Sequence, residues 1–216
     1  MAERIVIYGG TFDPVHHGHL ITARAVAEHL GFERVTLMPA HVPPHKCRPG
    51  QDCVPISSPA QRLEMLRLAV AGDDLFEVSE LEIARPGPSY TFQTLQELQR
   101  LHGPQAQLYW IIGADMLSDL PNWYHAAEVV DLANIVTAAR PPYSDALEQV
   151  FAQLERSFSP SQVQHLREGV VATPRVEISA TDIRARAASG RPLEYLTPTA
   201  VIAYIQSRGL YHPEGV

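Results

Sequence analysis

The chain has 216 residues, of which 45% are hydrophobic and 19% charged, and this composition excludes a disordered or fibrous protein. The net charge of −7 excludes the broadly basic surface of a duplex nucleic-acid binder, and no apolar run has the length of a membrane span or a secretion signal. We therefore expect a cytoplasmic protein with a single domain, residues 1–216, and neither a nucleic-acid nor a membrane partner.

Strands and helices are predicted to alternate along the chain, the strands as short apolar runs and the helices as segments with one apolar face. In chain order we expect a strand at residues 4–8, a helix at 18–30, a strand at 34–38, a helix beginning at 59, a strand at 76–79, a helix at 92–101, strands at 108–112 and 134–138, helices at 146–156 and 161–168, a strand at 175–178, and helices beginning at 180 and 198. Such alternation indicates βαβ units joined by right-handed crossovers. The expected fold is a Rossmann-like α/β domain with a doubly wound parallel sheet, on which the C-terminal helical part, residues 179–216, packs.

The segment GGTFDPVHHGHL, residues 9–20, directly follows the first predicted strand. A strand, a glycine turn and a helix start together make a phosphate site, because free backbone N–H groups and the positive end of the helix dipole point at one spot. The adjacent Gly9 and Gly10 allow a ligand to approach the backbone, although they do not fit a GxGxxG dinucleotide fingerprint. His16 and His19 lie one helical turn apart, so both can reach the same phosphate. The segment therefore predicts a nucleotide-binding site.

The loop over residues 39–58 contains PPHK, in which two prolines stiffen the chain and Lys46 supplies a charge for a polyphosphate. An exposed lysine loop is the alternative. The same loop carries four potential metal ligands, which are His41, His45, Cys47 and Cys53. Their spacing matches none of the common zinc patterns, so we expect solvated loop residues and reduced thiols. At the end of the loop, Ser58 is the expected cap of the next helix and Pro59 its first residue.

A second helix start lies in ISATDIR, residues 178–184. Ser179 or Thr181 is expected to cap this helix, and Arg184 lies about one turn inside it, where it can contact a phosphate. An ordinary capped surface helix is the alternative.

Residues 9–20 resemble the GxFDPxHxGH signature of the nucleotidylyltransferase superfamily, and residues 178–184 resemble its ISxTxxR motif. Ala180 stands where many relatives carry a hydroxyl residue. The HxGH part also resembles the HIGH motif of class I aminoacyl-tRNA synthetases, but this chain is too short for an anticodon-binding region. Elements similar to those of bacterial nicotinate-nucleotide adenylyltransferases extend the likeness over most of the chain: PPHK at 43–46, SYT at 89–91, GAD at 113–115 with Trp123, and RP at 140–141.

The resemblance implies adenylyl transfer from ATP to nicotinate mononucleotide, which gives nicotinate adenine dinucleotide (deamido-NAD) and pyrophosphate in NAD biosynthesis. The catalytic residues that it implies are His16, His19, Lys46 and Arg184. Those for ATP are Gly9, Gly10, Thr11, Phe12, His16, Gly18, His19, Gly113, Asp115, Arg140, Ile178, Ser179, Thr181 and Arg184. Those for the mononucleotide are Thr11, Lys46, Ser89, Tyr90, Thr91 and Trp123, the last as a stacking face for the pyridine ring. The expected cofactor is Mg²⁺, bound mainly through the substrate phosphates rather than by a metal site of the protein.

The expected chemistry needs no general base, and none is assigned to Asp13. A phosphomonoester has its second pKa near ~6, so the attacking phosphate is already largely ionised at neutral pH. Catalysis then consists of holding two anions in line and stabilising the charge on the α-phosphate and the departing pyrophosphate.

Several alternatives stay open. The acceptor can instead be nicotinamide mononucleotide, phosphopantetheine or a cytidylyl-transfer substrate, and a non-catalytic nucleotide-binding module is the alternative from another class. Acid and amide at the pyridine ring are not distinguished, because backbone N–H groups can discriminate between them. A homo-oligomer is compatible with the sequence.

Overall fold

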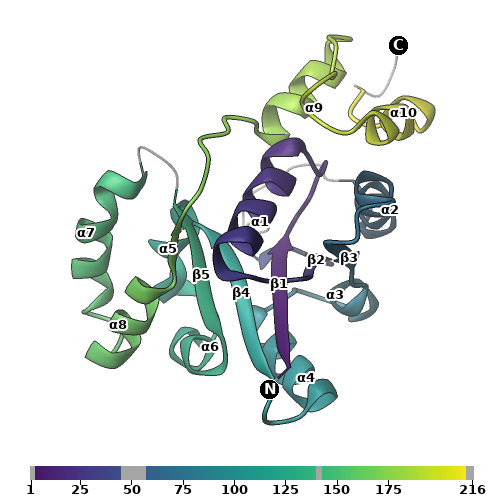
Figure 1. The fold of residues 1–216 in the computed structure, drawn as a ribbon. Helices are drawn as coiled ribbons and strands as arrows, with labels where there is room; N and C mark the ends of the chain where they lie inside the picture. Colours follow the sequence, from purple (N-terminus) through teal and green to yellow (C-terminus); the bar gives the residue numbers. More distant parts are fainter. Residues whose placement is uncertain (1–2, 45–56, 140–142, 213–216) are drawn as a thin grey trace.

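The computed structural model describes residues 3–44, 57–139 and 143–212 (Figure 1). Within these residues six parallel strands form one sheet in the order β3-β2-β1-β4-β5-β6. The strands are β1 (Arg4–Gly10), β2 (Val35–Pro39), β3 (Phe76–Val78), β4 (Gln107–Gly113), β5 (Asn134–Ala139) and β6 (Val170–Ala172). β1 lies between β2 and β4, and in this register Ile7 is the partner of both Thr36 and Trp110. The strand order therefore reverses between β1 and β4, where open α/β sheets bind their ligands.

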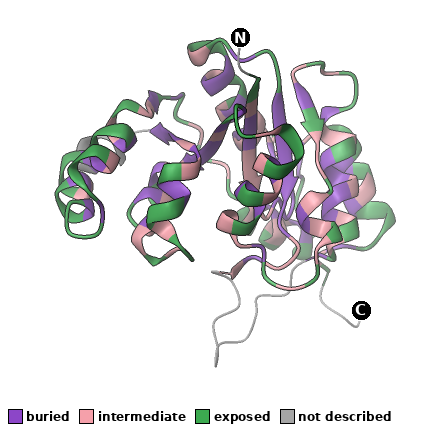
Figure 2. Cartoon of the chain, turned by 90° about the horizontal axis from the view of Figure 1, so that it is seen from below, coloured by how far each residue is buried: buried purple, intermediate pink, exposed green. Residues whose placement is uncertain are grey.

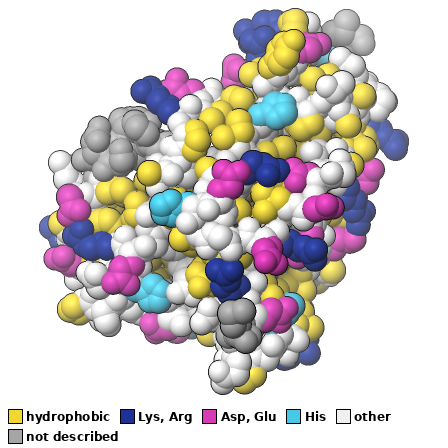
Figure 3. Space-filling model, viewed as in Figure 1, with side chains coloured by type: hydrophobic (Ala, Val, Ile, Leu, Met, Phe, Trp, Pro, Cys, Tyr) yellow, Lys and Arg dark blue, Asp and Glu magenta, His cyan; other side chains and the backbone are white. Residues whose placement is uncertain are grey.

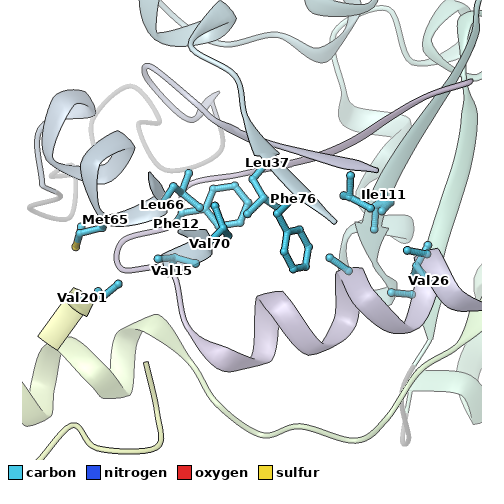
Figure 4. Packing of buried hydrophobic residues seen from close by; sticks show 14 of the residues in the cluster. Phe12, Val15, Val26, Leu37, Met65, Leu66, Val70, Phe76, Ile111 and Val201 are labelled. Carbon is cyan, nitrogen blue, oxygen red and sulfur yellow. The ribbon is translucent and has the colours of Figure 1, made fainter. Parts of the chain in front are cut away.

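Helices cover both faces of the sheet. They are α1 (His17–Leu30), α2 (Pro59–Val70), α3 (Leu81–Ala84), α4 (Thr91–His102), α5 (Ala114–Leu117), the 3₁₀ turn η2 (Leu120–Asn122), α6 (Ala126–Leu132), α7 (Tyr143–Leu154), α8 (Pro160–Glu168), α9 (Ala180–Ala188) and α10 (Thr199–Ser207). Two buried clusters result because the side chains of a strand alternate between its faces: Val6 packs with α1 and α2, whereas Ile7 packs with α4 and α6. Buried residues accordingly concentrate along the strands (Figure 2), and Figure 4 shows Phe12, Leu66 and Val70 together in the first cluster.

The C-terminal helices α9 and α10 belong to the first of these clusters. Ile183 of α9 and both Val201 and Ile205 of α10 are buried in it together with residues of β1, α1 and α2. α10 lies beside α2, at the end of α1 that follows β1 (Figure 1). The expectation that residues 1–216 form one domain stays a prediction.

The predicted doubly wound parallel α/β fold is confirmed, and its first five strands lie within two residues of their expected bounds. The prediction of a strand at residues 175–178 is wrong. The sixth strand is β6, in which two β-branched valines and an alanine pair with β5. β6 ends at Ala172, and Pro174 has no N–H group with which to continue the ladder. The short helices α3, α5 and α6 were not predicted.

Acidic and basic side chains are interspersed on the face shown in Figure 3. Among the described residues, each helix is too short or too polar to cross a membrane.

Candidate active site

A cavity of about 630 Å³ opens where the central strands end. Its walls include the carboxyl ends of β1 and β4 and the residues that follow β2 and β6. Most of the expected site residues line it: Gly9, Gly10, Thr11, Phe12, His16, Gly18, His19, Ser89, Tyr90, Thr91, Gly113, Asp115, Trp123, Ile178 and Ser179. Thr181 and Arg184 do not, and Lys46, Arg140, His45, Cys47 and Cys53 lie outside the described residues.

His16 and His19 act as a pair at the start of α1. His16 is the N-cap residue and is only 6% exposed. Its backbone N–H donates to Nδ1 of His19 at 3.2 Å, and the two rings stack with their centroids 3.7 Å apart. Because Nδ1 of His19 accepts this bond, the proton of a neutral His19 ring resides on Nε2. The structure thus fixes both the orientation and the tautomer of a histidine on the cavity wall.

The glycines of this region are required by close approach rather than by turn geometry. A Cβ on Gly9 would lie 2.4 Å from Cζ2 of Trp110, which is a buried ring, so no larger residue fits without moving the core. A Cβ on Gly18 would lie 3.0 Å from Nδ1 of His16. Any side chain at Gly18 would therefore press on the ring that stacks on His19.

The turn between β1 and α1 is strained and buried. Phe12 has φ = 50°, a left-handed backbone conformation that is uncommon for residues other than glycine. Its ring is 2% exposed and meets the edges of Tyr8 and His19, with centroid distances of 5.8 and 5.0 Å. Packing of the Phe12 ring therefore supports the turn that carries Thr11 along the cavity wall.

The start of α9 closes one side of the cavity. Ser179 is the N-cap, because its side chain accepts from the backbone N–H of Asp182 at 3.1 Å. Arg184 instead donates to the backbone carbonyl of Asp13 at 2.7 Å and to the hydroxyl of Thr181 at 3.2 Å. The structure therefore brings Ser179 to the cavity and holds Arg184 against the turn after β1. Phosphate binding by Arg184 and Thr181 stays a prediction.

A second wall of the cavity is aromatic and comes from the starts of α4 and α6. The rings of Tyr90 and Tyr124 lie 4.8 Å apart, and Tyr124 also meets His125 at 4.3 Å. Trp123 and the half-exposed Tyr124 both line the cavity. The sequence prediction included Trp123 and missed Tyr124. The position of Tyr124 directly after the tryptophan was the one feature that could have indicated its place on the cavity wall.

Two buried polar residues also line the cavity beside this aromatic wall and tie it to neighbouring segments. Ser89 is buried, and its hydroxyl accepts from the backbone N–H of His41 at 2.8 Å, which joins the wall to the loop after β2. Glu82 is 3% exposed, and its carboxylate accepts from the Thr94 hydroxyl at 2.7 Å. Burial raises the pKa of Glu82 above its ordinary value. Hydrogen bonds with Thr94 and Ser89 and the charge of Arg85 oppose this shift without cancelling it. Sequence reasoning missed Glu82, since one acidic residue in a short helix carries no pattern.

Comparisons with known proteins agree with this architecture. The chain matches the family described as cytidylyltransferase-like over residues 7–186. It is 46% identical to a probable nicotinate-nucleotide adenylyltransferase of Roseiflexus sp. (strain RS-1), with 96% of this chain and 97% of the relative covered. It is 38% identical to a protein of the same name from Yersinia pestis (strain Pestoides F), over 95% of this chain and 94% of that one. A Plasmodium falciparum nicotinic acid mononucleotide adenylyltransferase, solved in complex with NaAD, shares the fold with a TM-score of 0.72 at 16% identity, covering 97% of each chain.

Proposed function

The chain belongs to the nicotinate-nucleotide adenylyltransferase family, within the cytidylyltransferase-like group, and we infer that it transfers the adenylyl group of ATP to nicotinate mononucleotide. The products are nicotinate adenine dinucleotide and pyrophosphate. The observation that carries this inference is the His16–His19 pair, which shares one cavity with the aromatic wall of Tyr90 and Trp123.

In our proposal the turn after β1 and the start of α1 bind the α-phosphate of ATP. The N–H groups at the start of α1 and the positive end of its dipole attract the phosphate. His19 donates the proton of Nε2 to an α-phosphate oxygen, because its Nδ1 accepts from the His16 backbone. This donor is oriented before the reaction begins, so it stabilises the charge that develops in the transition state.

The proposed acceptor lies against the aromatic wall. Its pyridine ring stacks on Trp123, and Tyr90 and Thr91 contact the mononucleotide through hydroxyl and backbone groups. The phosphate of the mononucleotide then attacks the α-phosphate in line, and pyrophosphate departs with the bonding electron pair. Lys46, Arg140 and Arg184 are proposed to bind the outer phosphates.

A divalent cation, which we propose to be Mg²⁺, completes the charge balance on the triphosphate. The described residues contain no group of three or more histidine, cysteine or acidic side chains close enough to hold a metal ion. The carboxylate of Asp115 on the cavity wall offers oxygen ligands of the kind that Mg²⁺ accepts, and phosphates and water would supply the rest. When bound, the cation withdraws charge from the phosphate oxygens.

The proposal also places the enzyme in the cytoplasm.

The test is pyrophosphate release from ATP with a panel of acceptors. Nicotinate mononucleotide should exceed nicotinamide mononucleotide in kcat/KM by roughly 5- to 150-fold, because an amide leaves donors aimed at a carboxylate poorly paired, at a cost of about 1–3 kcal/mol. Equal efficiency would remove the preference for the acid but keep adenylyl transfer. Release with phosphopantetheine, or with CTP in place of ATP, would reassign the acceptor or the nucleotide. ATP binding without release for any acceptor would indicate a non-catalytic module.

A further inference from the structure

A buried arginine on α2 joins three separate segments of the backbone. Arg62 is 0% exposed. Its Nε donates to the carbonyl of Ser57 at 3.1 Å, its Nη1 to that of Thr11 at 2.9 Å and its Nη2 to that of His41 at 2.9 Å. Of these carbonyls, one belongs to the turn after β1 and one to the loop after β2, so a single guanidinium fixes the separation of the two segments.

The link continues to the aromatic wall through His41. The carbonyl of His41 accepts from Arg62, and its backbone N–H donates to the hydroxyl of Ser89 at 2.8 Å. Ser89 directly precedes Tyr90, which lines the cavity. A continuous series of hydrogen bonds therefore runs from Thr11 on one wall of the cavity, through Arg62 and His41, to the start of α4 on the other.

The buried carboxylate of Asp13 lies close enough to Arg62 to act on its charge. Asp13 is 1% exposed and accepts from the hydroxyl of Tyr211 at 2.7 Å and from the backbone N–H of Ser57 at 3.2 Å. Burial lowers the pKa of Arg62 below its ordinary value, and the negative charge of Asp13 opposes this shift in part. Removing either Arg62 or Asp13 would leave the other charge buried without compensation, which is costly. The pair therefore favours a single conformation of the Arg62 side chain.

We propose that Arg62 is a positioning residue, which sets the distance between the phosphate-binding turn and the acceptor wall and so aligns the two substrates for in-line attack. This inference rests on the proposed function, because only a reaction between two bound phosphates depends on that distance. Arg62 has no exposed surface, so a bound substrate cannot contact it in this conformation. Its effect must therefore appear in kcat, since a misplacement of about 1 Å costs roughly 10²-fold in rate.

The principal test is chemical rescue of Arg62→Ala. We expect kcat to fall by about 10²-fold and the KM for ATP to change far less. Added guanidinium ion at sub-denaturing concentration should restore much of the rate, whereas urea, which has a similar shape but no charge, should not. The matched control is Arg67→Ala on the same helix. Arg67 is exposed and pairs with Glu80, so its removal should leave kcat unchanged and guanidinium without effect.

Arg62→Lys is the second variant, because it keeps the buried charge and loses the planar fork of donors. It should fold more readily than Arg62→Ala and have an intermediate kcat. Wild-type kcat in either folded variant would overturn the proposal. A loss of kcat that only follows the loss of folded protein, as measured by circular dichroism, would also overturn it.

Hydrogen exchange measured without substrate separates this proposal from the assigned reaction. Both variants should exchange faster than the wild type in peptides that cover residues 9–13 and 38–44, and the peptides of α7 and α8 should be unchanged. Unchanged exchange near Thr11 and His41 would contradict the positioning role. Absence of pyrophosphate release by the wild-type enzyme would instead contradict the function.

Discussion

The two walls of the cavity are built in different ways. The wall from β1 and α1 is buried and fixed by backbone contacts: Phe12 and His16 are 2% and 6% exposed, and His19 accepts from the main chain. The wall from α4 and α6 presents aromatic rings, among which Tyr124 is 48% exposed and touches mainly other rings. A phosphate group is the same in every nucleotide, so a rigid site suits it. Side chains on the more exposed aromatic wall can be replaced without altering the backbone contacts of the phosphate site.

The largest effect is expected for His19→Ala, which removes the oriented donor from the rigid wall. kcat should fall by roughly 10²–10³-fold, the loss typical of one preorganised donor. The KM values should change far less, because the turn after β1 still binds the phosphates. Steady-state kinetics on the folded variant check this. His17→Ala is the matched control, since His17 starts the same helix but does not line the cavity. Near-normal turnover of a folded His19→Ala protein would contradict the proposed role of the pair.

An intermediate effect is expected for Trp123→Ala on the aromatic wall. Loss of a stacking face should cost about 1–3 kcal/mol in mononucleotide binding, by analogy with base–aromatic stacking, which is roughly 5- to 150-fold in KM. The KM for ATP should stay nearly constant. Trp123→Phe should recover most of the loss, because it keeps an aromatic ring. If only ATP binding or the melting temperature changes, Trp123 is a packing residue and the two walls do not divide the substrates.

The smallest effect is expected for Ser58→Ala, which alters a helix cap and neither wall. Ser58 accepts from the backbone N–H of Gln61 at 3.2 Å and donates its own N–H to the Gln61 side chain at 2.8 Å. Its loss should lower the free energy of unfolding by about 1 kcal/mol. Ser159→Ala is the matched control, since it removes an equivalent cap from α8. Urea denaturation measures both. A fall in kcat for Ser58→Ala but not for Ser159→Ala would show that the rigid wall of the cavity also depends on the start of α2.

The sequence predicted those parts of the molecule that depend on local order. The turn after β1 and the cap at Ser58 are set by neighbouring residues, so their patterns are readable. Arg62 was not singled out, because its three acceptors are 5, 51 and 21 residues away in the chain. The hydrogen bond from Arg184 to the carbonyl of Asp13 was not predicted either, because the two residues are 171 positions apart in the sequence. Contacts of such separation follow from the packing of helices, and a single sequence does not contain them as a pattern.

The bond between Asp13 and Tyr211 has a consequence for the order in which the enzyme is completed. These residues are 198 positions apart in the sequence. At a synthesis rate of about 5–20 residues per second, Asp13 leaves the ribosome roughly 10 to 40 s before Tyr211 does. During that interval the carboxylate next to the phosphate-binding turn lacks the tyrosine hydroxyl that it accepts from in the finished protein. The six described strands all end by Ala172, so a nascent chain contains every one of them before it contains the residue that completes this turn, and a chain cut short before Tyr211 would lack this hydrogen bond.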